Sequence, residues 1–372
     1  MSTALYIHVP FCASRCAYCD FFSTTQGAEA RRAYVDALCA ELRGRREECC
    51  GDVMSVYFGG GTPSQLSEAE LERILGVIFE EYALAPDAEI TLEANPDDVS
   101  RPWAEAVCRM GFNRVSLGVQ TFDDDLLRLV RRRHTSRQAV EAIELLGGTL
   151  GLNVSADLIY ALPGQTLEAW RADLLQMLRL PISHLSAYCL SFEEGTALWK
   201  WRAEGRVSEA EDELVRSMYM LLIQSVREAD FEHYEMSNFC RVGRHSRHNS
   251  AYWNGTPYIG CGPAAASYDG HRLRRTNSPD LVAYIVAAGA PPHTDERLSD
   301  ANLYDEAVML RLRTSAGLPL SLLAASDADY LLAAAAPHLR AGRLVREGDV
   351  LRLTPAGILV SNDVLSDLMR AE

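Results

Sequence analysis

The sequence has no long apolar run and no recognisable targeting segment. None of its stretches reaches the roughly 18 consecutive apolar residues that a membrane-spanning helix needs. The first residues carry neither the basic start nor the apolar core of a secretory signal, and a mitochondrial leader is also missing. We therefore expect a cytoplasmic protein with no transmembrane segment.

Basic residues are also in short supply. Lysine and arginine together number 36, against 51 aspartates and glutamates, and the formal net charge is −15. General affinity for nucleic acid depends on clustered basic side chains, so this balance argues against a nucleic-acid partner. Two short basic runs, "RRRH" (131–134) and "RVGRHSRH" (241–248), can still bind an anion.

Three of the ten cysteines lie close together, and no fourth accompanies them. The segment "HVPFCASRCAYCDF" (8–21) contains Cys12, Cys16 and Cys19. Three thiolates can hold a 4Fe–4S cluster through three of its irons and leave the fourth iron open to another ligand. A structural zinc site usually takes four protein ligands, and the next cysteine, Cys39, falls in a predicted helix. The spacing therefore favours an iron–sulfur cluster over zinc or three unconnected thiols.

The other cysteines need no special function. Without an export signal the thiols should remain free or bind metal, as is usual in a reducing compartment. We expect five of them to be small buried hydrophobic residues, namely Cys39, Cys49, Cys50, Cys108 and Cys189.

Short β-rich segments recur at a spacing of roughly 30 residues, the length of a βαβ unit. They lie at 4–9, 53–58, 89–94, 114–119, 153–160 and 184–190. Helical patterns separate them, as in 31–43 and in 67–82, where Ser67 and Glu70 form a capping box. The apolar stripe of the second helix is predicted to be Leu71, Ile74, Leu75, Ile78 and Phe79.

This alternation predicts an α/β fold with a parallel, barrel-like sheet. In such barrels the reactive residues lie where the strands end. Polar or glycine-rich elements do occur at these places: "GGGT" (59–62), Glu93, Gln120 and Asp157, with the cysteine segment after the first strand. The sequence therefore predicts one site over one face of the barrel.

The pattern changes after about residue 200. A helix is predicted at 209–228, followed by the Gly- and aromatic-rich stretch 248–268 and a Pro-rich linker, "GAPPHTDERLSD" (289–300). Helices at 302–313 and 327–341, a hairpin at 343–353 and a last helix from Pro355 then suggest a small winged-helix-like domain. We divide the chain into a partial barrel (1–205), an extension (206–290) and a C-terminal α-plus-hairpin domain (291–372).

The cysteine segment has the C-x₃-C-x-aromatic-C pattern of the radical S-adenosylmethionine (SAM) superfamily. Further segments, in order, resemble the oxygen-independent coproporphyrinogen III oxidase-like branch of that superfamily: "LYIHVPFC", "YFGGGTPS", "LEANPDD", "SLGVQTFDDDLLRLVRRRH" and "DLIYALPGQT". The resemblance covers nearly the whole chain. It implies a three-quarter (β/α)₆ barrel, which agrees with the six predicted strands.

The resemblance also implies a function for matching positions. Cys12, Cys16 and Cys19 would bind the 4Fe–4S cluster, and SAM would occupy its open iron. The residues that would contact SAM are Tyr6, Tyr18, Gly60, Gly61, Thr62, Glu93, Gln120, Arg132 and Asp157. On residue type alone, Arg132 in "RRR" could equally be a solvated surface charge.

This branch contains both the oxidase and the HemW-type haem chaperone. The oxidase pattern has a fourth cysteine where this chain has Phe21, and it has a long extension before the cluster motif, where this chain has eleven residues. "HNSAYW" (248–253) matches the HNxxYW motif that is associated with haem binding in the chaperone. These three features favour the chaperone, and coproporphyrinogen III oxidation is the alternative.

His248 is the predicted haem ligand, because neutral imidazole is a common axial ligand of haem iron. Tyr252 and Trp253 would supply a flat apolar wall, and propionates would pair with Arg241, Arg244 and Arg247. The same residues could instead be core, His245 could be the ligand, or a zinc set could form from Cys240, His245, His248 and Cys261.

The predicted cofactors are therefore a 4Fe–4S cluster, SAM and haem. The resemblance to the chaperone implies that the recipients of the haem are haem-dependent respiratory enzymes of the membrane. Contact with the inner membrane would then be peripheral and through these partners. The sequence leaves open whether SAM is cleaved and whether the chain forms a homodimer.

Overall fold

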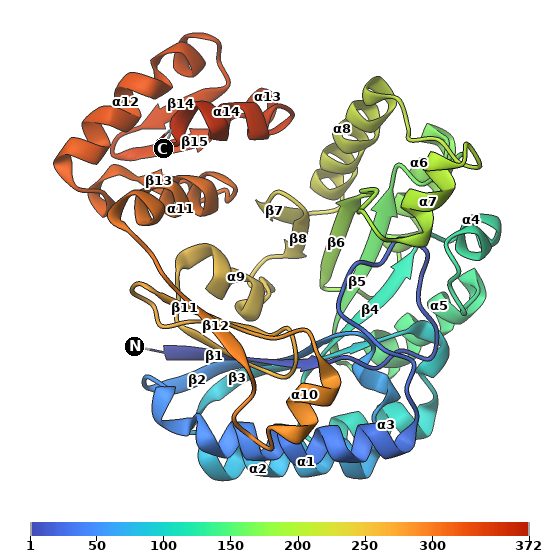
Figure 1. Ribbon diagram of the computed structural model, residues 1–372. Coiled ribbons are helices and arrows are strands. Elements are labelled where there is room, and N and C mark those ends of the chain that lie inside the picture. Colours follow the sequence, from blue (N-terminus) through green and yellow to red (C-terminus); the bar gives the residue numbers. More distant parts are fainter. Residues whose placement is uncertain (1, 371–372) are drawn as a thin grey trace.

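Six strands in the first half of the chain pair in parallel and follow one another in the sheet in chain order. The computed structural model describes residues 2–370 (Figure 1). The six strands are β1 (Ser2–Val9), β2 (Asp52–Gly60), β3 (Leu84–Ala94), β4 (Arg114–Gln120), β5 (Asn153–Tyr160) and β6 (His184–Cys189). Each coincides with a predicted strand, which confirms the expected partial barrel.

Helices connect these strands and cover the outside of the sheet (Figure 1). They are α1 (Ala28–Gly44), α2 (Glu68–Glu81), α3 (Arg101–Arg109), α4 (Asp124–Leu129), α5 (Ser136–Ile143) and α6 (Leu167–Met177), and α7 (Ala197–Ala203) follows the sixth strand. The predicted capping box at the start of α2 is present, with the Ser67 N–H 2.7 Å from Glu70 Oε2.

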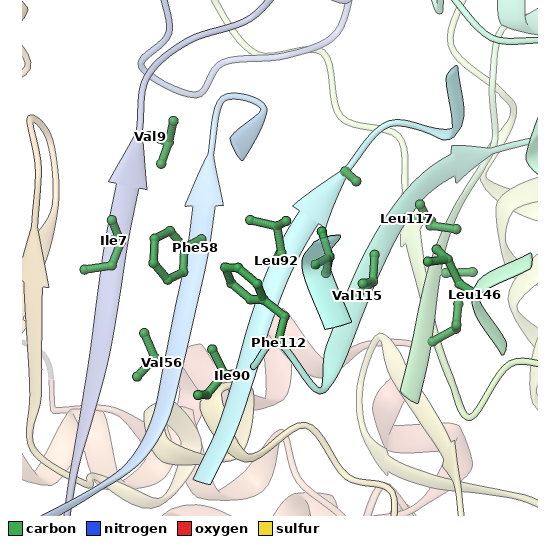
Figure 2. Close-up of a cluster of buried hydrophobic side chains, with 14 of the residues drawn as sticks. Ile7, Val9, Val56, Phe58, Ile90, Leu92, Phe112, Val115, Leu117 and Leu146 are labelled. Carbon is green, nitrogen blue, oxygen red and sulfur yellow. The ribbon is translucent and has the colours of Figure 1, made fainter. Parts of the chain in front are cut away.

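The side chains of the strands alternate between two environments. One set is apolar and fully buried under the helices; Figure 2 shows part of it, including Ile7, Phe58, Leu92 and Leu117. The set between them is polar and lines the interior of the barrel, which we call the lumen. Because successive side chains of a strand point to opposite faces, one strand supplies both the core and the site.

Two details of this packing differ from the predictions. Phe79 is 49% exposed, whereas Val77 is buried, so the buried face of α2 is rotated toward Val77. Among the five cysteines expected to be buried, only Cys39 is; Cys49 and Cys108 are half-buried, and Cys50 and Cys189 are exposed. These last four lie near the ends of helices and strands, where the core no longer covers the chain.

Residues beyond 205 extend the sheet at both edges to twelve strands. On one side β9 (Tyr258–Cys261) pairs in parallel with β1, followed by β10 (Ala266–Tyr268), β11 (Leu273–Asn277) and β12 (His293–Arg297); on the other, β8 (Asn238–Arg241) and β7 (Phe231–Glu235) follow β6. The helices of this part are α8 (Asp212–Glu228), α9 (Arg247–Asn254) and α10 (Leu281–Val286).

The predicted linker at 289–300 is wrong for its central part. Residues His293–Arg297 form β12, which pairs with the open edge of β11. An edge strand that is exposed on both faces has no apolar alternation, so its sequence resembles that of a loop.

The C-terminal helices and strands form a separate group in the ribbon (Figure 1). This group has its own core, formed by Tyr304, Val308, Leu331, Leu351 and other apolar residues. Its elements are α11 (Asp300–Leu312), β13 (Leu318–Pro319), α12 (Ala325–Arg340), β14 (Leu344–Glu347), β15 (Val350–Leu353), α13 (Pro355–Ile358) and α14 (Ser361–Leu368). Helices around a small antiparallel sheet are the winged-helix-like arrangement that we expected.

The last predicted helix is divided in two. It starts at Pro355 as expected, but Val360 leaves the helical conformation (φ −128°, ψ 31°), and α14 begins after it. None of the helices between residues 2 and 370 combines the length and the apolar character that a membrane span needs.

The packing predicts that replacing Phe58 lowers the free energy of unfolding far more than replacing Phe79. Phe58→Ala should lower the free energy of unfolding by about 3–5 kcal/mol, because it leaves a cavity in the core beneath the helices. Phe79→Ala is the matched control, since Phe79 is half exposed, and we expect a change of about 0.5 kcal/mol. Urea unfolding followed by circular dichroism measures both, and equal effects would contradict this description of the core.

Candidate functional site

A cavity of about 550 Å³ occupies the lumen and opens where the six parallel strands end. Residues from all six strands line it, together with the loops that follow β1 and β2 and with helix α9. It brings together the predicted cysteines, all nine predicted SAM residues and His248.

The three cysteines lie in the loop after β1, and backbone hydrogen bonds hold this loop in place. The Cys12 N–H donates to Thr24 O (2.9 Å) and the Ala17 N–H to Val130 O (3.0 Å). Two donors approach the sulfur atoms: the Thr62 hydroxyl lies 3.4 Å from Cys12 Sγ, and Arg132 Nη1 lies 3.3 Å from Cys16 Sγ. Three thiols in one cavity wall, with donors directed at them, fit an iron–sulfur cluster better than three unconnected residues.

Burial opposes ionisation of these thiols. It raises the pKa of Cys12 and raises the pKa of Cys19 to about 11. Because metal ligands must be thiolates, the positive charge of bound iron has to compensate for this burial.

The glycine-rich segment after β2 is pinned against the end of β1. The Gly61 N–H donates to Val9 O and the Thr62 N–H to Phe11 O, both at 2.8 Å. Gly60 has φ +105°, and a Cβ there would lie 2.6 Å from the His8 ring. Only glycine fits such a position, and Gly60, Gly61 and Thr62 all line the cavity.

Two carboxyl groups line the lumen from β3 and β5, on either side of β4. The Tyr57 hydroxyl donates to Glu93 Oε1 at 2.7 Å. Burial, with a contribution from the Asp157 charge, raises the pKa of Glu93 to about 7, and burial raises the pKa of Asp157 to about 6. The oxygens of both carboxyl groups can accept hydrogen bonds from ammonium or ribose hydroxyl groups of a ligand. Because such donors favour the ionised form of a carboxyl group, a bound ligand would lower both pKa values.

Arg132 is a lumen residue and not a solvated surface charge. Its Nη2 donates to Asn95 Oδ1 (2.6 Å) and to Gly118 O, and its Nε has no hydrogen-bond partner among residues 2–370. Gln120 ends β4 with φ +71°, a conformation that few non-glycine residues adopt. The Gln120 amide lies close to the Arg132 guanidinium beside Gly118. A Cβ on Gly118 would lie 2.8 Å from Gln120 Nε2 and 3.0 Å from Arg132 Nη2.

Two tyrosines complete the predicted set. Tyr6 stacks on Tyr57 (ring centroids 6.3 Å apart), and its hydroxyl lies 3.1 Å from His8 Nδ1. Tyr18 packs against the apolar cluster of Leu126, Val130, Ile159 and Leu162. Burial raises the pKa of both tyrosines, so both hydroxyls are protonated at neutral pH.

His248 lies on α9 and is 3% exposed, facing the lumen. Its Nδ1 is 3.0 Å from Ser55 Oγ, and its Nε2 is 3.0 Å from the hydroxyl of Tyr252, four residues further along the HNxxYW motif. Burial, with the charge of Arg114, lowers the pKa of His248 to about 3. The imidazole is therefore neutral, as an iron ligand must be, but a ligand at Nε2 has to displace Tyr252.

Other predicted haem contacts lie outside the cavity. Tyr252 lines it, whereas Trp253 and the three arginines do not. Arg247 pairs with Asp87 at the surface (2.7 Å), and Arg241 lies over the ring of Phe231. The predicted propionate partners are therefore not in the lumen.

The suggested zinc set is also divided. Cys240 and His245 lie together with Glu232, and the potential ligand atoms of these three residues are within 4.8 Å of one another. Glu232 Oε2 is 3.1 Å from His245 Nε2. His248 and Cys261 do not belong to this group within the described chain.

The sequence analysis missed several lumen residues. Asn95, which links Arg132 to Thr62, directly follows a predicted strand end and could have been found by that rule. Arg114 and His184 open β4 and β6 at the opposite ends of the strands. A polar first residue of a buried strand was the available signal for both.

Comparisons with known proteins agree with this geometry. Residues 6–177 match the family model of the Radical SAM superfamily, and residues 298–360 match the HemN C-terminal domain. The "Heme chaperone HemW" of Synechocystis sp. is 36% identical over 330 residues, which cover 86% of this chain and 79% of that protein. The protein of the same name from Mycobacterium tuberculosis is 35% identical over 372 residues, covering 98% and 94%.

The chain belongs to the HemW family. As a radical SAM protein it uses a 4Fe–4S cluster and SAM, and the predicted resemblance and cofactor class are thereby confirmed. Coproporphyrinogen III oxidase (HemN) from Escherichia coli has the same fold, with a TM-score of 0.83 over 99% of this chain and 90% of that chain, at 23% identity.

The raised pKa of Glu93 predicts a specific pH dependence. The folded protein holds this proton up to about pH 7, whereas the ordinary value is 4.5, so wild type loses the associated stability as the pH rises between these values. Glu93→Gln has no such proton to lose. Its free energy of unfolding relative to wild type should therefore increase from pH 4.5 to pH 7, as measured by urea unfolding across this range.

The matched control is Glu72→Gln, which removes an exposed carboxyl from α2. Its pH profile should follow that of wild type. A Glu93→Gln profile that also runs parallel to wild type would show that Glu93 does not bind its proton more tightly in the fold.

Proposed function

We propose that this protein is a haem chaperone that binds haem in the lumen and delivers it to haem-dependent enzymes. The observation that carries the proposal is that a neutral histidine of the HNxxYW motif lines the same cavity as the three cysteines. Its family membership supports the same conclusion, since the relatives that match over most of the chain are named heme chaperones.

We assign the cluster to Cys12, Cys16 and Cys19. Arg132 and Thr62 would stabilise the thiolates by donating hydrogen bonds to sulfur. When bound, the cluster supplies electrons and one open iron at which SAM can be held.

The SAM site would be built from the strand ends. Gly60, Gly61 and Thr62 would let its amino-acid end approach the backbone, while Glu93 and Asp157 would accept hydrogen bonds from its ammonium and hydroxyl groups. Tyr6, Tyr18, Gln120 and Arg132 would enclose the remainder. Glu93 and Asp157 line the cavity, whereas the apolar side chains of the same strands are buried under the helices, and this arrangement supports the assignment.

His248 would bind the haem iron through Nε2. Ser55 fixes the ring through Nδ1, so that the Nε2 lone pair is available once the Tyr252 hydroxyl turns away. The Tyr252 hydroxyl would thus occupy Nε2 of His248 until haem binds and displaces it.

The recipient would be a haem-dependent respiratory enzyme of the membrane, reached from the cytoplasm by peripheral contact. The C-terminal domain is the surface that we assign to this contact. It contacts the end of α9 through a hydrogen bond from Arg311 Nη2 to Asn254 O (2.6 Å), and it contacts β11 through the Arg274–Glu306 ion pair (2.7 Å). If the chain forms a homodimer, the dimer would present two such surfaces. Nucleic acid is disfavoured as a partner, because the net charge of the chain is −15.

Coproporphyrinogen III oxidation is the less favoured alternative. The likeness to the oxidase is one of fold at 23% identity, and the position of the extra oxidase cysteine is taken by Phe21, which is exposed at the cavity mouth. Formation of protoporphyrinogen from coproporphyrinogen III by reduced protein with SAM would favour the oxidase instead.

The cluster assignment predicts the effect of single cysteine changes. Cys16→Ala should abolish most of the roughly four irons per chain that anaerobic reconstitution introduces, because the remaining two thiolates cannot hold a cubane. Iron and sulfide analysis and the visible absorption band measure this loss. Cys50→Ala, at an exposed cysteine far from the cavity, should keep the full content; the same loss in both variants would contradict the assignment.

The haem assignment predicts different effects for neighbouring histidines. His248→Ala should weaken haem binding by about tenfold or more, because the iron loses its ligand. His245→Ala, three residues away and outside the cavity, should bind as wild type does. A haem titration followed by the Soret band measures both affinities.

Tyr252→Phe provides a second and opposite test. Because it removes only the hydroxyl that engages Nε2, haem should bind at least as tightly as in wild type. If His248→Ala leaves the haem affinity and the Soret position unchanged, His248 is not the haem ligand. If Tyr252→Phe abolishes haem binding, the Tyr252 hydroxyl does not compete with haem iron for Nε2.

A further inference from the structure

Arg114 is a buried arginine without an adequate partner. It opens β4 and is 2% exposed, and its Nε has no hydrogen-bond partner within residues 2–370. Its ion pair with Glu89 is long, with 3.9 Å between Nε and Oε2. A guanidinium has five N–H donors, and burying them unpaired is strongly unfavourable.

The same protein contains a buried arginine with a purely structural role, and the two differ clearly. Arg45 is 6% exposed, and its guanidinium bonds to Glu41, Glu48, Ser267 and the Gly260 carbonyl at 2.7–3.2 Å. Arg114 has no comparable set.

The nearest acid is already engaged elsewhere. Glu89 Oε1 accepts the backbone N–H groups of Arg247 (3.1 Å) and His248 (3.3 Å) at the start of α9. Negative charge at a helix N-terminus is stabilised by those groups, so Glu89 is held toward α9. The remaining surface of the Arg114 side chain faces the lumen, whose lining includes Arg114.

The surroundings select the type of anion. Glu93 and Asp157 line the same cavity, so a doubly charged phosphate would be repelled by both. A carboxylate carries one charge and matches the planar guanidinium with two parallel hydrogen bonds. Tyr57 and Tyr252, also in the lining, can contact the apolar body that bears it.

We propose that Arg114 binds a ligand carboxylate inside the lumen. Two ligands of this protein could supply it: a propionate of haem, which rests on the proposed function, or the amino-acid end of SAM. Arg114 and Gln120 mark opposite ends of β4, roughly 20 Å apart along the strand. The cysteines and Gln120 lie at the far end, although the charge of Arg114 also acts on Glu93 and Asp157 of the expected SAM site. We favour the propionate because Glu89 links Arg114 to the start of α9, which carries His248.

The test compares Arg114→Gln with Arg137→Gln. Arg137 is an exposed arginine of α5 that pairs with Glu141, so the control removes the same charge far from the lumen. Haem and haem dimethyl ester, in which both propionates are neutral, are titrated by the Soret band. SAM is measured by equilibrium dialysis on anaerobically reconstituted protein.

We expect wild type and Arg137→Gln to bind haem more tightly than its dimethyl ester, and Arg114→Gln to lose about tenfold in haem affinity but little for the ester. Arg114→Lys keeps the charge without the paired geometry, and should fall between them. If Arg114→Gln weakens SAM and leaves haem unchanged, the carboxylate is that of SAM.

Failure of this inference can be told apart from failure of the proposed function. If wild type binds no haem, the chaperone function is wrong, and the SAM measurement alone then tests Arg114. If the folded Arg114 variants bind haem, the ester and SAM as Arg137→Gln does, Arg114 does not bind a ligand carboxylate.

Discussion

The register of the parallel strands is the constraint on which the rest of this structure depends. Tyr6 lies opposite Tyr57 in the β1–β2 pair, and Asp157 lies between Gly118 and Ser186 in neighbouring strands. Because side chains alternate along each strand, this register directs all of these residues into the lumen and their apolar neighbours under the helices. A slip of one residue would exchange the two sets, placing carboxylates in the core and apolar groups in the site.

Burial in this lumen controls the charge state of the site. It raises the pKa values of the carboxyl groups of Glu93 and Asp157 toward neutrality and lowers that of His248. At pH 7 the imidazole of His248 is therefore neutral, Glu93 is near the midpoint of its titration and Asp157 is mostly ionised, so a charged ligand can shift the ionisation of the two acids. The two arginines of the lumen differ from these groups, because a guanidinium cannot lose its charge. Arg132 bonds to Cys16, Asn95 and Gly118, whereas Arg114 lacks such partners among the residues described and needs an anion.

The segment after residue 205 connects the haem motif to the barrel. It adds strands to both edges of the sheet, and between them it places α9 against β2 and β3, where Ser55 and Glu89 hold His248. The C-terminal domain then contacts α9 through Arg311. A single short helix thus lines the cavity on one side and contacts the C-terminal domain on the other.

The sequence by itself determined the six strands, most of the helices and the residues at the strand ends, since hydrophobic periodicity, caps and glycines act over a few residues and leave a local pattern. The cysteine segment and the residues from Glu93 to Asp157 could be grouped by one rule, that parallel strands end at the same edge. Only the tertiary structure decided that β12 pairs at an edge, that Phe79 is exposed, that Arg241 and Arg247 lie outside the cavity, and that Arg114 faces its interior. These outcomes depend on contacts between segments far apart in the chain, where burial and unpaired charge are set by neighbours that no local pattern specifies.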